Sequence, residues 1–294
     1  MATDQELRRQ IETVSDLSGI VRTMKALAAV NGRQFERALQ SLGEYEHTVE
    51  RGVQVALRGK PLRKAGRQRP PAGLAAVIFG SDVGLCGRFN EDLVALAVDT
   101  MNGWQVPLMA RRVLAVGARV EARLNEHGHP LAATLPTPGS PLGIAPTLGQ
   151  ILQRLDAWRE QSIEHVWLFY SHAGVPRMVH LLPVDLQQFS RLIREPWPSR
   201  TLPGSPLDPE RLLAACLRQH VFVSLFRACL ASLAAEQQLR LQAMQAAEKN
   251  IQERLEGLVS ASRCQRQNAI DAELLDIGAG FEAVIGAVRL GPAR

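Results

Sequence analysis

One stretch near the start of the chain decides the fold: residues 4–60, DQELRRQIETVSDLSGIVRTMKALAAVNGRQFERALQSLGEYEHTVERGVQVALRGK. It contains no proline, and a large apolar or small residue recurs at every seventh position: Leu7, Val14, Val21, Ala28, Phe35, Leu42, Val49 and Ala56. That interval is one seam of a heptad repeat. A second, less regular seam runs through Ile11, Leu17, Met24, Leu39, Tyr45 and Val53. The pattern predicts one long helix whose narrow apolar stripe packs against another helix.

The other end of the chain carries a second long helical pattern. Asp208 is a suitable N-cap, Pro209 fits the first helical position, and Glu210 makes the first turn acidic. Between Glu210 and Ile277 the only glycine or proline is Gly257. Apolar residues continue at helical spacing through Leu225, Met244, Ile251, Leu255, Leu258, Ile270, Leu274, Ile277, Phe281 and Val284. Two such helices predict an antiparallel coiled coil, in which the longer second helix extends beyond the first.

The middle of the chain alternates apolar strand-like runs with helical stretches. Strands are predicted at Leu74–Phe79, Val113–Val116, Val166–Tyr170 and Met178–Leu182, helices at Asn90–Thr100 and Leu148–Arg159, and a Pro/Gly-rich connection from Pro130 to Pro146. Such alternation is typical of an α/β layer domain. We therefore predict the fold class α/β, with a long antiparallel coiled coil of N- and C-terminal helices and an inserted Rossmann-like α/β domain. The predicted boundaries are 1–60, 70–200 and 206–288.

Composition narrows the class of protein. The 294 residues carry a formal net charge of +5, which favours an anionic partner, but aromatic residues make up only 5% and do not interleave with Arg or Lys as base-stacking platforms do. Nucleic acid is therefore disfavoured. No window reaches the roughly 18 uninterrupted apolar residues of a membrane span. Four well-separated cysteines, Cys86, Cys216, Cys229 and Cys264, are expected to be unpaired thiols in a reducing cytoplasm.

A glycine-rich turn, Gly80-Ser-Asp-Val-Gly-Leu-Cys-Gly87, lies between a predicted strand and a predicted helix, where phosphate-binding loops occur. It lacks the Gly-Lys-Ser/Thr ending of a phosphate loop, and its glycines do not follow G-x-G-x-x-G. We interpret Asp82, Gly84 and Gly87 as parts of a structural turn. His127 and His129 lie in a loop without a carboxylate or cysteine companion. No catalytic residue, cofactor site or metal site is predicted.

A polar belt covers Val259 to Ala269 of the second helix, a stretch without Leu, Ile, Met or Phe. If Leu7 lies opposite about Ile285, the belt faces roughly residues 22–31, where Arg22 and Lys25 add positive charge. Two interpretations stay open. The belt is either a solvated helix face or a collar that acidic loops of another protein bind.

Three motifs resemble those of the gamma subunits of F-type ATP synthases. Ile11-Glu12-Thr13-Val14, Ile20 and Thr23–Ala29 resemble the amino-terminal signature, and Ser81–Asn90 resembles the turn D-x-G-L-C-G-x-x-N. The carboxy-terminal signature is matched in order and spacing by Glu236, Arg240, Ala243, Met244, Asn250, Arg266, Gln267, Ile270, Glu273, Leu274, Ile277 and Gly280. The chain departs from the family pattern at Gly19, Val83, Arg88, Ser262, Arg263 and Asp271, which leaves a diverged, alternate F-type ATPase open.

The resemblance implies a non-catalytic rotor subunit of a proton- or sodium-transporting complex. Its coiled coil stands inside a hexamer of alpha and beta subunits, and its α/β domain contacts the epsilon subunit and the membrane c-ring. The residues implied to contact the beta subunit are Met24, Arg240, Arg266, Gln267 and Glu273. The protein would then be cytoplasmic, peripheral on the inner face of the cell membrane, and bind no cofactor or nucleic acid.

Two other functions remain as alternatives from the sequence. An α/β enzyme with a coiled-coil RNA-binding arm should show a nucleotide signature and clustered aromatic residues. A scaffolding coiled coil would leave the α/β insert without a role.

Overall fold

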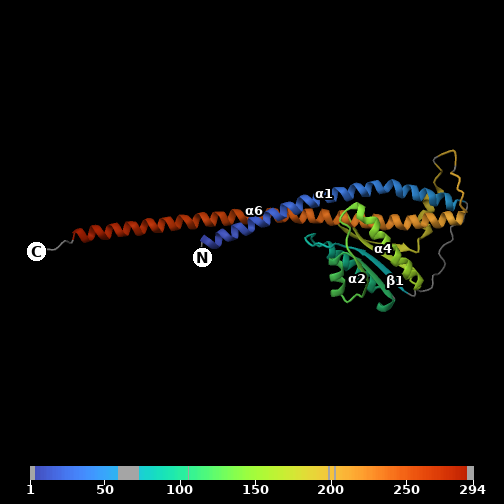
Figure 1. Ribbon diagram of the computed structural model, residues 1–294, viewed down its shortest axis with the longest axis horizontal. Coiled ribbons are helices and arrows are strands. Elements are labelled where there is room, and N and C mark those ends of the chain that lie inside the picture. Colours follow the sequence, from blue (N-terminus) through green and yellow to red (C-terminus); the bar gives the residue numbers. More distant parts are fainter. Residues whose placement is uncertain (1–3, 59–72, 105, 198, 202, 290–294) are drawn as a thin grey trace. The chain divides into compact units, whose positions relative to one another are not determined.

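The computed structural model describes residues 4–58, 73–104, 106–197, 199–201 and 203–289 (Figure 1). It divides into two compact units, one formed by Met1–Ala26 with Met244–Arg294 and the other by Leu27–Ala243. Helices α1 (Asp4–Leu57) and α6 (Pro209–Arg289) contribute residues to both units. The sequence also contains a basic run without acidic residues, from Arg58 to Arg69, which apart from Arg58 lies outside the described residues.

A five-stranded sheet forms the centre of the larger unit. Its order is β3-β2-β1-β4-β5, with β1 (Leu74–Phe79), β2 (Arg111–Val116), β3 (Leu131–Leu135) and β4 (His165–His172) parallel. Strand β5 (Val175–Leu182) pairs antiparallel with β4. All six residues of β1 are buried, as expected for a central parallel strand covered on both faces. The predicted α/β fold class is confirmed.

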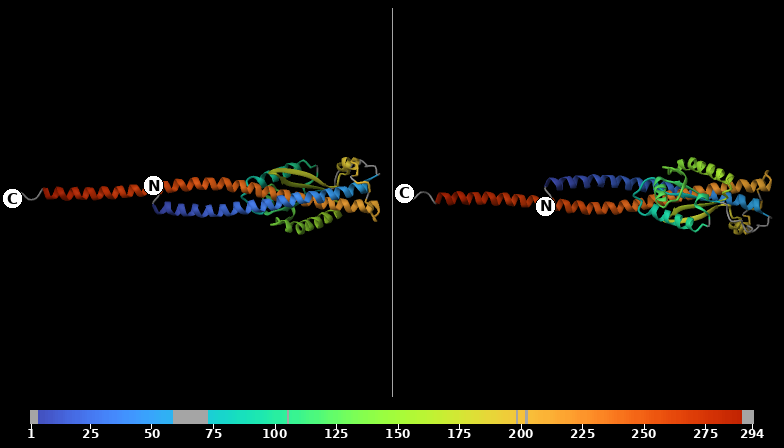
Figure 2. Two further views of the ribbon diagram at one scale, coloured as in Figure 1. Left: turned by 90° about the horizontal axis from the view of Figure 1, so that it is seen from above. Right: turned by 90° about the horizontal axis from the view of Figure 1, so that it is seen from below.

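Helices cover both faces of this sheet (Figures 1 and 2). Ala76 and Ile78 of β1 pack towards α2 (Phe89–Asn102) and α3 (Ala118–Glu126). Val77, Phe79 and their neighbours pack on the other face, against α4 (Pro141–Glu160) and against parts of α1 and α6. The alternation follows from the strand repeat of two, which sends successive side chains to opposite faces.

Three short elements complete the larger unit: η1 (Leu108–Ala110), η2 (Leu186–Phe189) and α5 (Ser190–Arg194). Phe189 packs with Val53 and Leu57 of α1 in a separate small core. Gln54 of α1 donates hydrogen bonds to the carbonyls of Leu192 and Glu195, at 2.8 and 2.9 Å. The segment after the sheet is thereby fixed to the end of α1.

Two elements of the sheet domain differ from the sequence-based expectation. The segment Pro130–Pro146 is not only a connection, since it contains β3 and the first residues of α4. Strand β3 lies at a sheet edge and buries only its last residue, Leu135, so its sequence has no strong apolar pattern. Helix α3 was not predicted because its nine residues bury only Val120 and Leu124.

The heptad seam of α1 agrees with the structure. Leu7, Ala28, Phe35, Val49 and Ala56 are buried, while Val14, Val21 and Leu42 are half-buried. The residues of the second seam are buried less consistently, because Leu17 and Tyr45 are exposed. Within the larger unit α1 and α6 lie side by side and antiparallel. Glu46 accepts a hydrogen bond from Arg227, and a Cβ on Gly52 would touch Sγ of Cys216 (Figure 2).

The part of α6 in the larger unit is rich in buried apolar residues. By length and composition alone α6 contains an 18-residue window apolar enough to cross a membrane, with a mean hydropathy of 1.3, of which 28% is buried; the sequence analysis did not expect this. The core helix of a soluble domain has the same composition, and here Leu225, Leu230 and Leu233 are buried against the sheet. Packing against the sheet therefore accounts for the apolar character of these three leucines.

The register within the smaller unit differs from the predicted one. Arg22 and Lys25 both form ion pairs with Glu248, so these side chains lie next to residue 248 rather than next to the polar belt. Because both helices rise equally per residue, extending this register places the start of α1 opposite about Asn268. The belt therefore faces the first turns of α1.

The apolar spacing of the second helix predicts Leu274 as a seam residue of the coiled coil, and the same register explains why that prediction is wrong. Its side chain is 61% exposed, and Ile270, Leu275 and Ile277 are also exposed, since α1 begins too late to cover them. In this unit the buried apolar residues of α6 are instead Met244 and Leu258.

Candidate functional site

The glycine-rich turn after β1 is held by the carboxylate of Asp82. One carboxylate oxygen accepts a hydrogen bond from the main-chain N–H of Ala118 at 2.8 Å. The other accepts from the N–H and the hydroxyl of Thr137, at 2.8 and 2.7 Å. Ala118 is the first residue of α3, so this negative charge also lies at a helix amino terminus, where it is favourable. Asp82 thereby connects three segments at the carboxyl edge of the sheet.

Two glycines at this edge are required by close packing. A Cβ on Gly80 would lie 1.9 Å from Cγ2 of Val120, and one on Gly117 would lie 2.7 Å from the main chain of Ser81. Gly117 also has a φ of +116°, which side chains rarely adopt. By contrast, a Cβ on Gly84 would meet nothing closer than 3.6 Å. The sequence analysis did not single out Gly80 or Gly117, because the crowding arises between segments distant in the sequence.

The interior of the turn is closed by a small polar cluster. Asn90 accepts a hydrogen bond from the N–H of Ser81 at 3.1 Å and donates to the Ser81 hydroxyl at 2.8 Å. The buried Cys86 thiol lies 3.6 Å from the Asn90 amide nitrogen. Burial raises the pKa of the Cys86 thiol, so it stays protonated at neutral pH. This cluster gives the turn a structural role.

A polar stripe on α6 connects the helix to the same turn. Ser232 donates to the carbonyl of Phe79 at 2.6 Å and accepts from the N–H of Ser171 at 3.2 Å. Two turns further on, the guanidinium of Arg240 donates to the carbonyls of Val83 and Gly84, at 2.8 and 3.3 Å. The helix repeat places residues 232, 236 and 240 on one face, which therefore faces the carboxyl edge of the sheet.

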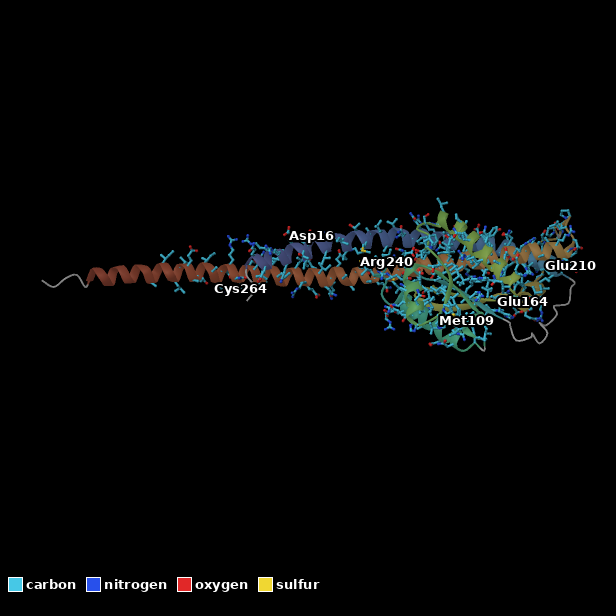
Figure 3. All side chains as sticks on the ribbon, turned by 60° about the horizontal axis from the view of Figure 1, so that its bottom comes forward. Asp16, Met109, Glu164, Glu210, Arg240 and Cys264 are labelled. Atoms are coloured by element: carbon cyan, nitrogen blue, oxygen red, sulfur yellow. The ribbon has the colours of Figure 1, made fainter. Side chains whose placement is uncertain are left out.

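Glu236 and Arg240 form a buried ion pair within this stripe, with 2.6 Å between Nη2 and Oε1. Burial raises the pKa of Glu236, and the positive charge of Arg240 opposes that rise. Figure 3 shows Arg240 on α6 where that helix meets the sheet domain. Arg240 is only 7% exposed, so its guanidinium makes its contacts inside this chain.

The other residues implied to contact a partner belong to the smaller unit. Met24 is half-buried and lines a shallow apolar hollow together with Ile20 and Thr23. Arg266, Gln267 and Glu273 are exposed. Among the described residues, Arg266 has no carboxylate within ion-pair distance. The structure thus brings Arg240 together with the turn at Asp82 and Gly84, and leaves Arg266 and Gln267 on an open surface.

The remaining candidates of the sequence analysis are the histidines and cysteines in the described part of the chain. It contains no group of three or more His, Cys, Asp and Glu side chains suited to a metal ion. The four cysteines are free. His129 is buried rather than solvated as a loop histidine would be, and burial lowers its pKa.

Comparison with known proteins identifies the family. Residues 3–284 match the family model ATP-synt, described as ATP synthase. The ATP synthase gamma chain of Methylococcus capsulatus is 25% identical over 291 residues, which cover 97% of this chain and 100% of that one. The ATP synthase gamma chain of Nitratiruptor sp. is 25% identical over 299 residues, with the same coverage.

Solved structures share the fold. A chain of the mitochondrial ATP synthase of Euglena gracilis, solved with its F1 part and c-ring, aligns with a TM-score of 0.60 at 16% identity and covers 99% of this chain and 97% of that one. A chain of the central stalk and c-ring of the Tetrahymena thermophila mitochondrial ATP synthase aligns with a TM-score of 0.53 at 22% identity, covering 78% and 99%. With the family match over nearly the whole length, the chain belongs to the gamma-chain family of ATP synthases.

Proposed function

We propose that this chain is the rotating central stalk of an F-type ATP synthase. It couples rotation of the membrane c-ring to ATP synthesis or hydrolysis on a hexamer of alpha and beta subunits. The observation that supports this most directly is the exposed end of α6. There Ile270, Leu274, Leu275 and Ile277 are exposed without a partner in the described residues of this chain, as a surface that binds another protein would be.

The chain itself does no chemistry in this proposal. ATP is made or hydrolysed on the beta subunit, and the stalk changes the conformation of that subunit by presenting different faces as it turns. The complex is proposed to transport protons or sodium ions. The sheet domain contacts the epsilon subunit and the c-ring, which makes the protein peripheral on the cytoplasmic face of the membrane.

Within this assembly the candidate residues have two roles. Arg266, Gln267 and Glu273 contact the beta subunit directly, since their side chains are exposed. Met24 also belongs to the coupling region. Arg240 is better described as a positioning residue, because its hydrogen bonds fix the turn at Val83 and Gly84 rather than reaching outwards.

The proposal is tested by isolating the chain from native membranes with a mild detergent and identifying what co-purifies. We expect alpha, beta and epsilon subunits and the c-ring in a single complex that hydrolyses ATP. Recovery of the chain alone, or of RNA in place of the ATPase subunits, would reject the rotor function.

A second experiment tests membrane contact through the basic run. Its charges are Arg58, Lys60, Arg63, Lys64, Arg67 and Arg69. We propose that they lie near anionic headgroups or acidic ring loops, so replacing all six with Gln should weaken assembly on anionic membranes and remove its dependence on salt. Unchanged assembly at low salt would make the run a solvated connector.

A further inference from the structure

Two histidines face each other on neighbouring strands of the sheet, and the rotor function gives them no role. His165 begins β4 and His180 lies near the end of β5, with 3.2 Å between Nδ1 of His165 and Nε2 of His180. The ring centroids are 5.4 Å apart and the ring planes are tilted by 32°, so the rings meet through their nitrogen-bearing edges rather than by stacking. Both side chains are half-buried. Glu164, the residue before His165, marks this end of β4 in Figure 3.

A β-bulge in β5 brings the two rings together. The pairing of β5 with β4 shifts so that Leu181 is left over between two paired residues, Leu182 and His180. Leu181 and Leu182 both pack into the core on the α4 side of the sheet. His180 pairs with Trp167 and therefore lies diagonally opposite His165 on the other face. Bulges often redirect a side chain beside a functional site, and here the bulge leaves an imidazole, not a leucine, next to His165.

The indole ring of Trp167 supports the ring of His180. Their centroids are 4.6 Å apart, with an angle of 51° between the planes. Trp167 itself packs against the core that the sheet forms with α2 and α3. One of the two imidazoles is thus oriented by the fold, with a ring nitrogen directed at His165. A ligand oriented in advance loses less conformational freedom when it binds.

The separation of the two nitrogens suits a divalent transition-metal ion. Two Zn–N bonds of about 2.0 to 2.1 Å across the gap of 3.2 Å enclose an angle of about 100°, between the octahedral and tetrahedral values. When both rings are neutral, the proton that lies between them moves to the far nitrogen of the ring that donated it. Each facing nitrogen then has a lone pair for the ion, and a small rotation of one ring directs both lone pairs to one point.

The chemistry of the ligands narrows the choice of ion. Imidazole nitrogen suits zinc, nickel and copper, whereas magnesium and calcium bind oxygen. The described residues contain no group of three or more His, Cys, Asp and Glu side chains suited to a metal ion, so water molecules have to complete the coordination of an ion held by this pair. The half-buried position of both rings leaves room for such water. The ion is therefore expected to exchange with solution.

We propose that His165 and His180 together bind one divalent transition-metal ion of the zinc, nickel and copper class. The bound ion joins the edge strand β5 to β4 and thereby stabilises this end of the sheet. The inference does not depend on the rotor function, because it rests only on the two histidines and the strands that carry them.

The experiment measures binding of Zn²⁺ to the purified full-length chain by calorimetry. All samples carry Cys264→Ser, because an exposed thiol binds zinc by itself. His165→Gln and His180→Gln each remove one proposed ligand and keep a side chain that forms hydrogen bonds. His172→Gln is the matched control, since it removes an exposed histidine from the other end of β4. Circular dichroism verifies that each variant is folded.

We expect one Zn²⁺ per chain, bound at least about tenfold more weakly after either ligand is removed, since the loss of an outer-shell partner alone already costs that much. The control should change the affinity less than about twofold. Saturating Zn²⁺ should also raise the melting temperature of the chain with both ligands and not that of the two ligand variants. If the chain with both ligands does not bind Zn²⁺, or if all three variants weaken binding equally, the pair is a structural hydrogen bond only and the proposal is overturned.

Discussion

The two sections of α6 both carry large apolar residues at helical spacing, but these residues lie in opposite environments. In the larger unit, Leu225, Leu230 and Leu233 are buried against the sheet domain. In the smaller unit, Leu274 and Ile277 are exposed. Both sets recur at helical spacing, so the pattern alone does not distinguish a side chain that builds the fold from one left free to bind another molecule.

The charged residues of the two sections differ in the same way. Glu236 and Arg240 are buried and form an ion pair, and Arg240 also donates to main-chain carbonyls. Arg263 and Arg266 are exposed and have no ion pair among the described residues. The first section of α6 therefore determines the stability of the chain, and the second section is available to determine its activity in a complex.

The largest expected effect is that of Arg240→Ala. It leaves the carboxylate of Glu236 buried without a partner, together with the carbonyls of Val83 and Gly84. Breaking a buried ion pair by removing one partner costs about 3 to 5 kcal/mol. Urea unfolding of the full-length chain measures the loss. A change below about 1 kcal/mol would show that the contacts of Arg240 contribute little to the fold.

A slightly smaller effect is expected for leucine truncation in the buried section, and almost none in the exposed one. Leu225→Ala should cost roughly 2 to 5 kcal/mol, because a fully buried side chain leaves a cavity. Leu274→Ala should change the free energy of unfolding by less than about 0.5 kcal/mol, as is usual for exposed sites. Thermal and urea unfolding of the two variants compare the sections directly, and equal losses would contradict the difference in burial.

The sequence predicted the buried elements of the chain better than it predicted which residues of α6 are exposed. Local periodicity was sufficient to predict the central strand and the first helix. The strand follows from the apolar run Leu74–Phe79, and the helix follows from the heptad repeat between Leu7 and Ala56. The extent of Leu274 exposure was missed because it depends on where α1 begins relative to α6. The register set by Glu248 provides that information, and no local pattern contains it.

At the turn the sequence predicted the position but not the contacts. The glycine spacing excluded a phosphate loop, and Asp82 was singled out. The sequence predicted that Arg240 contacts the beta subunit, and it gave no sign that the guanidinium of this residue binds the turn 156 residues away in the sequence, at Gly84. Gly80 and Gly117 are constrained by Val120 and Ser81, which only the folded sheet brings near them.

A pH effect should accompany the loss of Arg240. Burial already raises the pKa of Glu236, and removing the positive charge of Arg240 should raise it further. The folded Arg240→Ala chain then binds a proton more tightly than the unfolded chain does, so its stability falls as the pH rises through that pKa. We expect the destabilisation relative to the unmodified chain to be smaller at pH 5 than at pH 7.5. The double variant Arg240→Ala/Glu236→Gln should lack this dependence.

The smallest effect on the chain itself is expected for Arg266→Ala, which removes an exposed side chain from the polar belt. The free energy of unfolding should change by less than about 0.5 kcal/mol. If acidic loops of the beta subunit bind Arg266 and Gln267 at some rotor angles, each contact is a charge-assisted hydrogen bond of roughly 1.5 to 3 kcal/mol that forms and breaks with rotation.

The variant should therefore assemble normally while the complex turns over ATP several-fold more slowly, about what a loss of 1 kcal/mol at one step produces. Arg254→Ala, an exposed arginine three turns earlier on α6, is the matched control and should leave turnover unchanged. If the Arg266→Ala complex turns over ATP as fast as the control complex, the proposed contact between Arg266 and the beta subunit is rejected. A chain that unfolds on this change would instead show that the polar belt belongs to the fold, which would place it with the buried section of α6.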